Sequence, residues 1–195
     1  MTSVVRAFDK EALSSARALV RAILEQPLGQ PWKLHDIGLL GLWLDPQRRH
    51  RLHIWDPGSS AVDELIHDHP LDFTATVIAG QITNTRYEED PAGQTYVRDR
   101  NVPGAEHDRS TDRVNLSGTS STYGPGERYD QSALELHSSA QVPGTVTLLR
   151  FTFVEVPVVT TCRRPGTPWV SGSARPAEPD EIERFTALAR PLLDA

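Results

Sequence analysis

The chain has 195 residues, and its 20 lysines and arginines against 26 aspartates and glutamates give a net charge of −6 with no clustered basic stripe, which argues against nucleic acid as a partner. It has neither an apolar run of membrane-spanning length nor a basic-then-apolar amino terminus, so we expect a cytoplasmic protein with no membrane partner. The length suits a single domain over residues 1–195, and the lone cysteine, Cys162, excludes an internal disulfide.

The first predicted element is a helix over residues 9–25. Apolar residues recur there at helical spacing, namely Leu13, Ala16, Leu19, Val20, Ile23 and Leu24. This pattern is typical of an amphipathic helix that lies on another element. The prolines and the glycine of segment 26–31 end it.

Strands follow the helix. Segments 32–45 and 51–56 predict two strands that are separated by a polar turn. The apolar run from Phe73 and the alternating stretch up to Glu89 predict a hairpin that turns at Ala79-Gly80.

The second half begins with a segment, 89–111, that is rich in Gly, Pro, Asp and Arg, which predicts a long surface loop. Two short strands are predicted within 113–131, on either side of a Gly-Pro-Gly turn, and further strands within 133–139 and 144–156.

The chain is predicted to end in an irregular, proline-rich segment, 157–179, and a helix over 179–194. Pro179 and Asp180 begin that helix, because proline and aspartate are favoured at helix starts. Its buried face is predicted to hold Ile182, Phe185, Leu188 and Ala189.

Many short strands with glycine turns, framed by single helices, predict an all-β fold, an antiparallel barrel or sandwich of the jelly-roll kind. Alternating βα units, a G-x-G-x-x-G pattern and a P-loop pattern are all missing from the sequence, which disfavours a doubly wound nucleotide-binding fold.

Two histidines stand at the start of the apolar run. If that run is a strand, His67 and His69 project from the same face, because side chains alternate, and the two rings could share a metal. An H-x-H pair alone is a weak signal, since seven histidines in 195 positions produce one by chance in roughly one chain in four.

The surrounding residues add to this signal. The spacing His67-x-His69-x3-Phe73-x6-Gly80 reproduces the first cupin motif, H-x-H-x3-E-x6-G, with phenylalanine in place of glutamate. His137, followed by Gln141, resembles the second motif, in which one histidine on a separate strand completes the metal site. Over about residues 34–155 the chain resembles the small bacterial members of the cupin superfamily.

The resemblance implies a cupin-type antiparallel β-barrel (jelly roll) over about 34–155, flanked by an N-terminal and a C-terminal helix, with His67, His69 and His137 as metal ligands. A set of three imidazoles is neutral and leaves the whole 2+ charge on the ion, which favours anionic incoming ligands. Similar sites occur in the cupin thiol dioxygenases, which implies Fe(II) as the cofactor, with Zn, Ni or Mn as alternatives.

Two aspartates lie near these ligands. Asp72 is the candidate for a fourth ligand, provided that a local bulge turns it inward. Asp68, between the two histidines, is predicted to point outward or to cap a turn.

The strand at 51–55 offers pocket residues. Arg51, His53 and Trp55 share one face and Leu52 and Ile54 the other, and an apolar face is the usual core. If the polar face points inward instead, Arg51 would clamp a substrate carboxylate, with Trp55 beside it, and His53 would act as a base or support a ligand.

Arg150 is predicted to be buried, because it lies inside an otherwise apolar strand, and to bind a substrate carboxylate or else pair with Glu135. Phe73 is expected to line the pocket. Tyr87, Tyr123 and Tyr129 are candidates to orient the substrate, with Tyr129 assigned a catalytic role.

The remaining histidines, His35, His50 and His107, are predicted at the surface. Nothing in the sequence places a base beside Cys162, so a cysteine nucleophile is not expected.

Together with the resemblance, these residues predict a metal-dependent cupin oxygenase, a non-haem iron dioxygenase that uses Fe(II) and O2 on a small anionic metabolite such as a cysteine-like thiol amino acid. Two alternatives stay open: a non-redox isomerase, epimerase or lyase for a sugar or hydroxy acid, and a non-catalytic small-molecule binding protein. Since barrel cupins often pair through edge strands, we expect a homodimer.

Overall fold

The computed structural model of the protein describes residues 9–60, 65–102, 105–153, 158–167 and 174–195, with the side chains of 101–102, 105–110 and 153 left out. Two α-helices, α1 (Lys10–Glu25) and α2 (Pro179–Asp194), and a short 3-10 helix, η1 (Pro27–Gly29), accompany the strands. The strands span Lys33–His35 (β1), Ile37–Trp43 (β2), His50–Ser60 (β3), Ile66–His67 (β4), Leu71–Ala79 (β5), Ile82–Val102 (β6), Ala105–Tyr123 (β7), Arg128–Gln131 (β8), His137–Gln141 (β9), Val146–Phe153 (β10), Val159–Arg163 (β11) and Ala174–Pro176 (β12).

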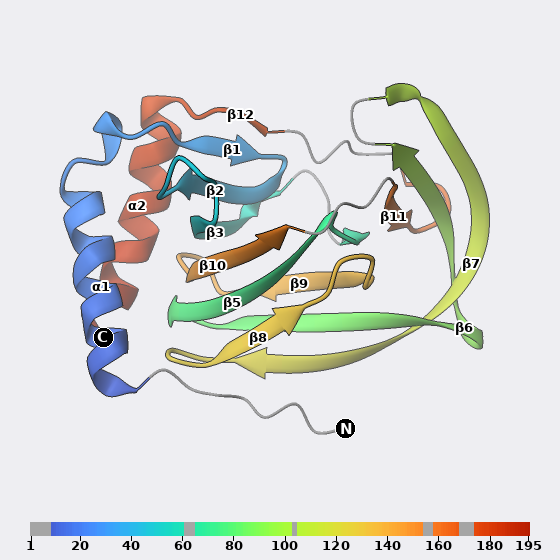
Figure 1. Cartoon of the computed structure of the whole chain (residues 1–195), viewed down its shortest axis with the longest axis horizontal. Coiled ribbons are helices and arrows are strands. Elements are labelled where there is room, and N and C mark those ends of the chain that lie inside the picture. Colours follow the sequence, from blue (N-terminus) through green and yellow to red (C-terminus); the bar gives the residue numbers. More distant parts are fainter. Residues whose placement is uncertain (1–8, 61–64, 103–104, 154–157, 168–173) are drawn as a thin grey trace.

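In the described part of the chain the strands form two antiparallel sheets. The first has the order β12-β1-β2-β3-β10-β5-β8, and the second has the order β11-β4-β9-β6-β7. Helices α1 and α2 lie side by side at one end, and the long pair β6 and β7 reaches the opposite end (Figure 1). The expected mostly-β fold with a helix near each end is confirmed, and the arrangement is compatible with a sandwich or jelly roll.

Both helices form where the sequence predicts them. The Asp9 side chain caps α1 by accepting a hydrogen bond from the Ala12 N–H at 2.7 Å. Glu178, rather than Pro179 or Asp180, caps α2, and the side chain of Glu181 bonds back to its N–H as a capping box. Two residues of the predicted apolar faces deviate, since Leu19 is exposed and Leu188 is only half-buried.

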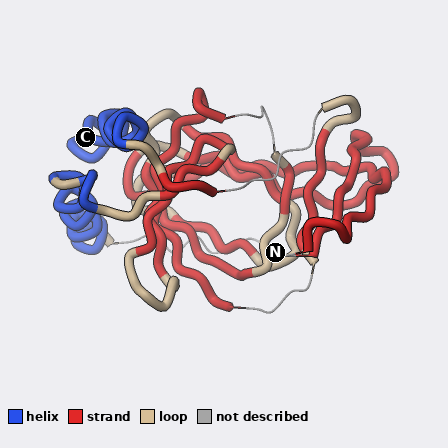
Figure 2. The backbone as a smooth tube through the Cα atoms, turned by 90° about the horizontal axis from the view of Figure 1, so that it is seen from above, coloured by secondary structure: helices blue, strands red, loops and turns tan. Residues whose placement is uncertain are grey.

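The main hydrophobic core lies between the helices and the first sheet. Phe185 of α2 and Leu24 of α1 pack with Leu52 and Ile54 of β3. Because side chains alternate along a strand, Arg51 and His53 then point to the other face, toward the second sheet. Viewed from above, the helices cover only one end of the strand layers (Figure 2).

The predicted hairpin at Ala79-Gly80 is wrong. Strand β5 pairs with β10 and β8 in the first sheet, whereas β6 pairs with β7, β9 and β11 in the second. Gly80, at φ +80°, carries the chain from one sheet to the other. The expected strand over 32–45 is likewise two strands, β1 and β2, which pair with each other.

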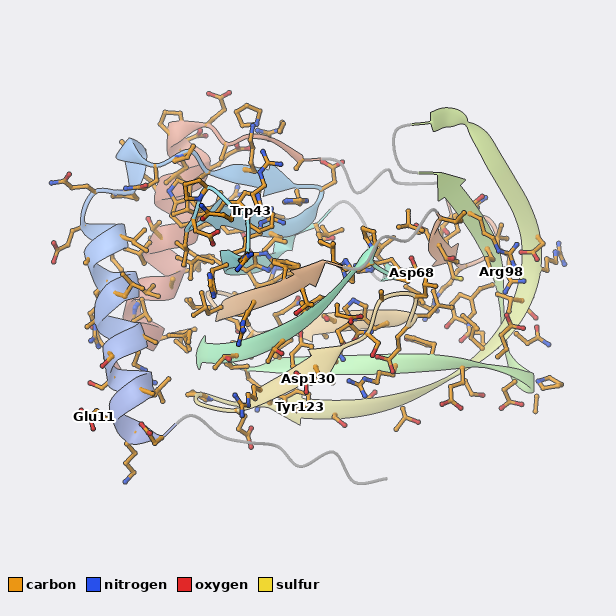
Figure 3. The ribbon with its side chains drawn as sticks, in the orientation of Figure 1. Glu11, Trp43, Asp68, Arg98, Tyr123 and Asp130 are labelled. Carbon is orange, nitrogen blue, oxygen red and sulfur yellow. The ribbon has the colours of Figure 1, made fainter. Side chains whose placement is uncertain are left out.

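The predicted long loop over 89–111 is also wrong, because residues 89–102 and 105–111 belong to the paired strands β6 and β7. Arg98 joins the strands by bonding both carboxylate oxygens of Asp112, at 2.8 and 2.7 Å, and a register shift between Glu89 and Gln94 absorbs the turn-forming residues. Figure 3 shows Arg98 on this hairpin and Glu11 on α1, at the other end of the molecule.

The segment expected to be irregular, 157–179, contains the strands β11 and β12. Strand β11 pairs with β4 and with β6, and β12 pairs with β1. Among the helices of the described residues, none combines the length and the apolar character that a bilayer crossing requires.

Candidate metal centre

Three histidines converge on one point between the sheets. His67 ends β4 and lies directly opposite His137, the first residue of β9, and His69 follows two residues after His67. One ring nitrogen from each lies within 4.8 Å of the other two, and His69 Nε2 and His137 Nε2 are 2.9 Å apart. The predicted grouping of these three imidazoles is confirmed.

Hydrogen bonds decide which nitrogen of two of these rings is free. His67 Nδ1 lies 3.2 Å from the carbonyl oxygen of Leu65, and His137 Nδ1 lies 2.7 Å from Asn84 Oδ1. Both oxygens only accept hydrogen bonds, so each Nδ1 carries the proton. The Nε2 atoms are left with the lone pairs that a metal ligand needs.

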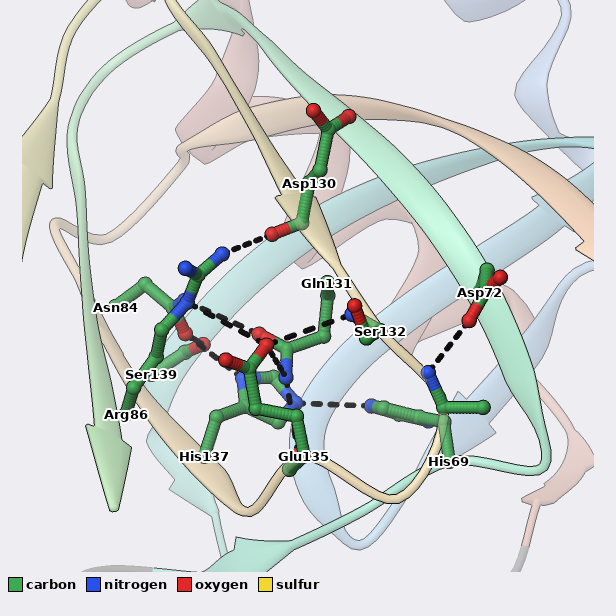
Figure 4. A network of polar contacts seen from close by, with 11 residues as sticks. His69, Asp72, Asn84, Arg86, Asp130, Gln131, Ser132, Glu135, His137 and Ser139 are labelled. Carbon is green, nitrogen blue, oxygen red and sulfur yellow. Dashed lines mark hydrogen bonds and ion pairs between the residues drawn. The ribbon is translucent and has the colours of Figure 1, made fainter. Parts of the chain in front are cut away.

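The orientation of Asn84 follows from a chain of polar groups behind His137 (Figure 4). Gln131 donates from its amide nitrogen to the Glu135 carboxylate at 3.0 Å, so its oxygen is the atom that accepts from Asn84 Nδ2 at 3.3 Å. Asn84 must then present its own oxygen to His137. Arg86 lies 3.5 Å from the Glu135 carboxylate and anchors the far end of the chain.

The donor set fits a divalent transition metal. Two nitrogens about 2.1 Å from one ion and at right angles to each other lie about 3 Å apart, close to the 2.9 Å between His69 and His137. Burial lowers the pKa of His67, His69 and His137 and so favours the neutral ring, the form that binds metal.

No carboxylate joins this cluster among the described residues. The Phe73 ring fills the position next to the triad, with its centroid 5.1 Å from that of His69. Asp72 accepts a hydrogen bond from the Ala133 N–H at 2.7 Å, on the opposite face of β5. Asp72, considered as a fourth ligand, therefore lies outside the cluster.

The expectation that Asp68 points outward is wrong. Its side chain is buried and accepts a hydrogen bond from the Thr160 N–H at 2.7 Å, which ties the segment between the two histidines to β11. Burial raises the pKa of the Asp68 carboxyl.

A cavity of about 630 Å³ lies between the two sheets, with the triad on its wall. The predicted pocket residues that line it are Arg51, His53, Trp55, Phe73 and Tyr129. The polar face of β3 therefore points into the cavity, while its apolar face packs on the helices. The sequence left open which face of this strand points into the pocket, and the structure shows that it is the face of Arg51, His53 and Trp55.

His53 and Arg51 have buried polar atoms that lack hydrogen-bond partners within the described structure. Both ring nitrogens of His53 and the Nε of Arg51 are buried with no hydrogen-bond partner. Burial lowers the pKa of His53 well below its usual value and that of Arg51 to about 10. Uncompensated polar atoms of this kind are rare in protein interiors and indicate a place for a ligand or water.

The Arg51 guanidinium occupies a defined place. It lies over the Trp43 ring, 5.1 Å from the centroid, and contacts Nε2 of His35. A Cβ added at Gly41 would be 2.5 Å from Arg51 Nη2, so the missing side chain of this glycine makes the room. The prediction that His35 is a surface residue is wrong, because it is half-buried and lines the cavity.

Two predicted substrate-binding residues lie elsewhere. Arg150 is exposed, because the cavity face of β10 is formed by Thr147 and Leu149 and Arg150 alternates to the other side. Tyr87 packs on Tyr96, with ring centroids 6.4 Å apart, outside the cavity lining.

Other residues fall as follows. Tyr123 packs on Tyr129, with centroids 4.9 Å apart, instead of lining the cavity. His50 is exposed and lies 3.2 Å from Asp45, as a surface residue should, and the His107 side chain falls outside the described residues. Cys162 is buried, which raises the pKa of its thiol to about 12 and makes it a poor nucleophile.

Sequence reasoning missed Asn84 and Gln131. A usable signal was present, because each shares a strand face with a buried neighbour, Ile82 for Asn84 and Tyr129 for Gln131. A polar residue on such a face must find partners, which marks it as part of a network.

No protein-family model and no curated protein sequence matches the chain. Support for a function therefore comes from the site itself: three imidazoles beside a cavity that also holds a buried guanidinium.

Proposed function

We propose that the chain is a cupin-type oxygenase that binds Fe(II) through His67, His69 and His137 and oxidises a small anionic metabolite with O2. The observation that carries the proposal is the triad itself, three histidines from two separate stretches of chain, of which His137 is buried and His67 and His69 are half-buried. No carboxylate of the described residues joins the cluster, and a cavity lies beside it. Such a set is typical of sites that keep coordination positions for reactants.

The bound ion would supply a template for substrate and O2 and the activation of O2. Phe73 lies next to the triad in the place of a carboxylate. The ligand set therefore carries no negative charge and would leave the positive charge of the ion undiminished. Asn84 keeps the proton of His137 on Nδ1, which holds the ring in the ligating form.

Substrate recognition is assigned to the polar face of β3. Arg51 offers a buried positive charge to a carboxylate, because a guanidinium binds this group through two parallel hydrogen bonds. Trp55 forms part of the wall, held by the hydrogen bond from its Nε1 to Thr147 Oγ1 at 3.1 Å.

Two groups can handle protons in the cavity. His53 is neutral, since burial lowers its pKa, so one ring nitrogen accepts a hydrogen bond and the other donates one. Burial raises the pKa of Tyr129, whose hydroxyl therefore stays protonated and acts as a donor.

Metal analysis of protein purified without oxygen tests this proposal. We expect stoichiometric iron in the wild-type chain and its loss in the His67→Ala, His69→Ala and His137→Ala variants. The matched control is His50→Ala, which removes an exposed histidine outside the cluster and should retain the metal. The iron-loaded protein should consume O2 when small anionic substrates are added.

Two results would contradict the proposal. Bound zinc, nickel or manganese with turnover that does not depend on O2 would indicate a Lewis-acid isomerase, epimerase or lyase. Absence of stoichiometric metal in the wild type would indicate a binding protein whose histidines are structural. A homodimer and a cytoplasmic location stay predictions.

A further inference from the structure

An aromatic wall connects the guanidinium to the histidine triad. The Trp43 ring, under Arg51, packs on Phe151 with centroids 5.3 Å apart. Phe151 packs on Phe73 at 5.8 Å, and Phe73 meets His69 at 5.1 Å. The cavity thus has a cationic group at one end of an aromatic surface and the triad at the other end.

Among the described residues, the guanidinium of Arg51 has no partner anion. No carboxylate of these residues forms an ion pair with it, and its Nε is buried with no hydrogen-bond partner. His53, which lies next to Arg51 on the same face of β3, offers a hydrogen-bond donor beside it. A carboxylate placed here would accept hydrogen bonds from Arg51 and from the protonated ring nitrogen of His53.

The size of the cavity argues against a very small ligand. Its volume of about 630 Å³ falls within the roughly 300–1,000 Å³ of pockets that bury drug-sized molecules. A cysteine-sized substrate would leave most of the aromatic wall in contact with water, so the apolar contact area would contribute little to binding.

We propose that the cavity takes an aryl-alkyl carboxylate, whose carboxylate binds Arg51 and His53 and whose aromatic part packs on Trp43 and Phe151. The end that reacts then lies toward the triad, and only this last point rests on the proposed function. The cysteine-like substrate expected from the sequence is replaced by a longer, flatter acid.

Calorimetric titration of the full chain, with bound metal and after chelation, tests the inference. The probes are hydrocinnamate, its primary amide hydrocinnamamide, acetate and cysteine. We expect hydrocinnamate to bind about 10-fold or more tightly than each of the other three, because only it carries both a carboxylate and an aromatic ring.

Two variants locate the binding. Arg51→Gln should lose the preference for hydrocinnamate over hydrocinnamamide. Gly41→Ala should weaken this preference, since the added methyl group displaces the guanidinium without removing its charge. Arg49→Gln, which changes an exposed arginine nearby, should behave as the wild type.

Equal affinities for acid and amide, for hydrocinnamate and acetate, or tightest binding of cysteine would each overturn the inference. These comparisons use wild-type protein, so they stand even if Arg51→Gln fails to fold. Selective binding of hydrocinnamate by protein that takes up no metal would sustain the ligand class and contradict the oxygenase, which separates the two proposals.

Discussion

The amide oxygen of Asn84 determines which tautomer His137 adopts, with the proton on Nδ1 and the lone pair on Nε2. If it sets the proton on Nδ1, Asn84→Leu should weaken metal binding by about 10-fold to 100-fold, because the ring loses the acceptor that orients it. Competition with a chelator of known affinity measures this change.

The conservative variant Asn84→Asp separates positioning from packing. Its carboxylate still accepts from His137 but meets the oxygen of Gln131 where the amide nitrogen stood, so stability should fall while metal affinity is retained. If Asn84→Asp and Asn84→Leu lose metal equally, the orienting role of the amide is refuted.

Two arginines show how far single residues can be placed from sequence alone. Arg51 and Arg150 both stand in apolar strands, yet only Arg51 reaches the cavity. The first sheet packs against the helices on one face and lines the cavity with the other. Alternation along a strand therefore sorts its residues into two faces but does not tell which face lines the cavity. The position of Arg150 depended on the pairing of β10 with β3 and β5, which the sequence does not contain.

Among the elements, the link between β5 and β6 depends on Gly80. At φ +80° an alanine is strained, and its Cβ would lie 2.5 Å from Thr145 Oγ1 and 2.8 Å from Thr145 Cα. Gly80→Ala should therefore lower the free energy of unfolding by about 1–3 kcal/mol. Urea unfolding measures this.

The matched control is Gly29→Ala in η1, where an added Cβ meets nothing within 4 Å. It should change the free energy of unfolding by no more than about 0.5 kcal/mol. Equal effects of the two substitutions would show that the crossing between the sheets tolerates a side chain.

The helices were predictable because an apolar stripe and a cap signal each of them locally, as Val20 and Asp9 do in α1. The hairpin of β6 and β7 was not predictable in this way. Its strands are joined by polar pairs such as Thr95 with Asn115, at 2.8 Å, so much of their sequence is hydrophilic and has the composition of a loop.

For the molecule as a whole, buried histidines make stability depend on pH. Burial lowers the pKa of His53 and of the three triad rings below 6.5, so between the folded and unfolded pKa values the unfolded chain binds more protons. The free energy of unfolding of chelator-treated protein should have its full value above about pH 6.5 and should fall as the pH drops below 6.5.

Replacing His53 by Phe should reduce the steepness of this fall. One titrating group contributes up to about 1.4 kcal/mol per pH unit. Chemical denaturation at a series of pH values measures both proteins, and identical slopes would mean that His53 is protonated to the same extent in the folded and unfolded chains.

The candidate metal site was the most predictable part of the whole, because the H-x-H spacing of His67 and His69 can be seen without knowledge of the fold. The expected shared strand face is wrong in detail, since β4 ends at His67 and His69 lies between β4 and β5. His137 lies 68 positions away from His69, so its convergence was expected from the resemblance and the barrel fold and not from local spacing. Several residues of the cavity wall were predicted, but its size and its full lining could not be, since its walls come from strands of both sheets.

Strand β3 keeps structural support and chemistry apart. Leu52 and Ile54 hold the helices on one side, while Arg51, His53 and Trp55 face the cavity on the other. Exchanges on the inner side would change the lining of the cavity without disturbing the anchoring of the helices, so the chemistry of the cavity can evolve on an unchanged scaffold.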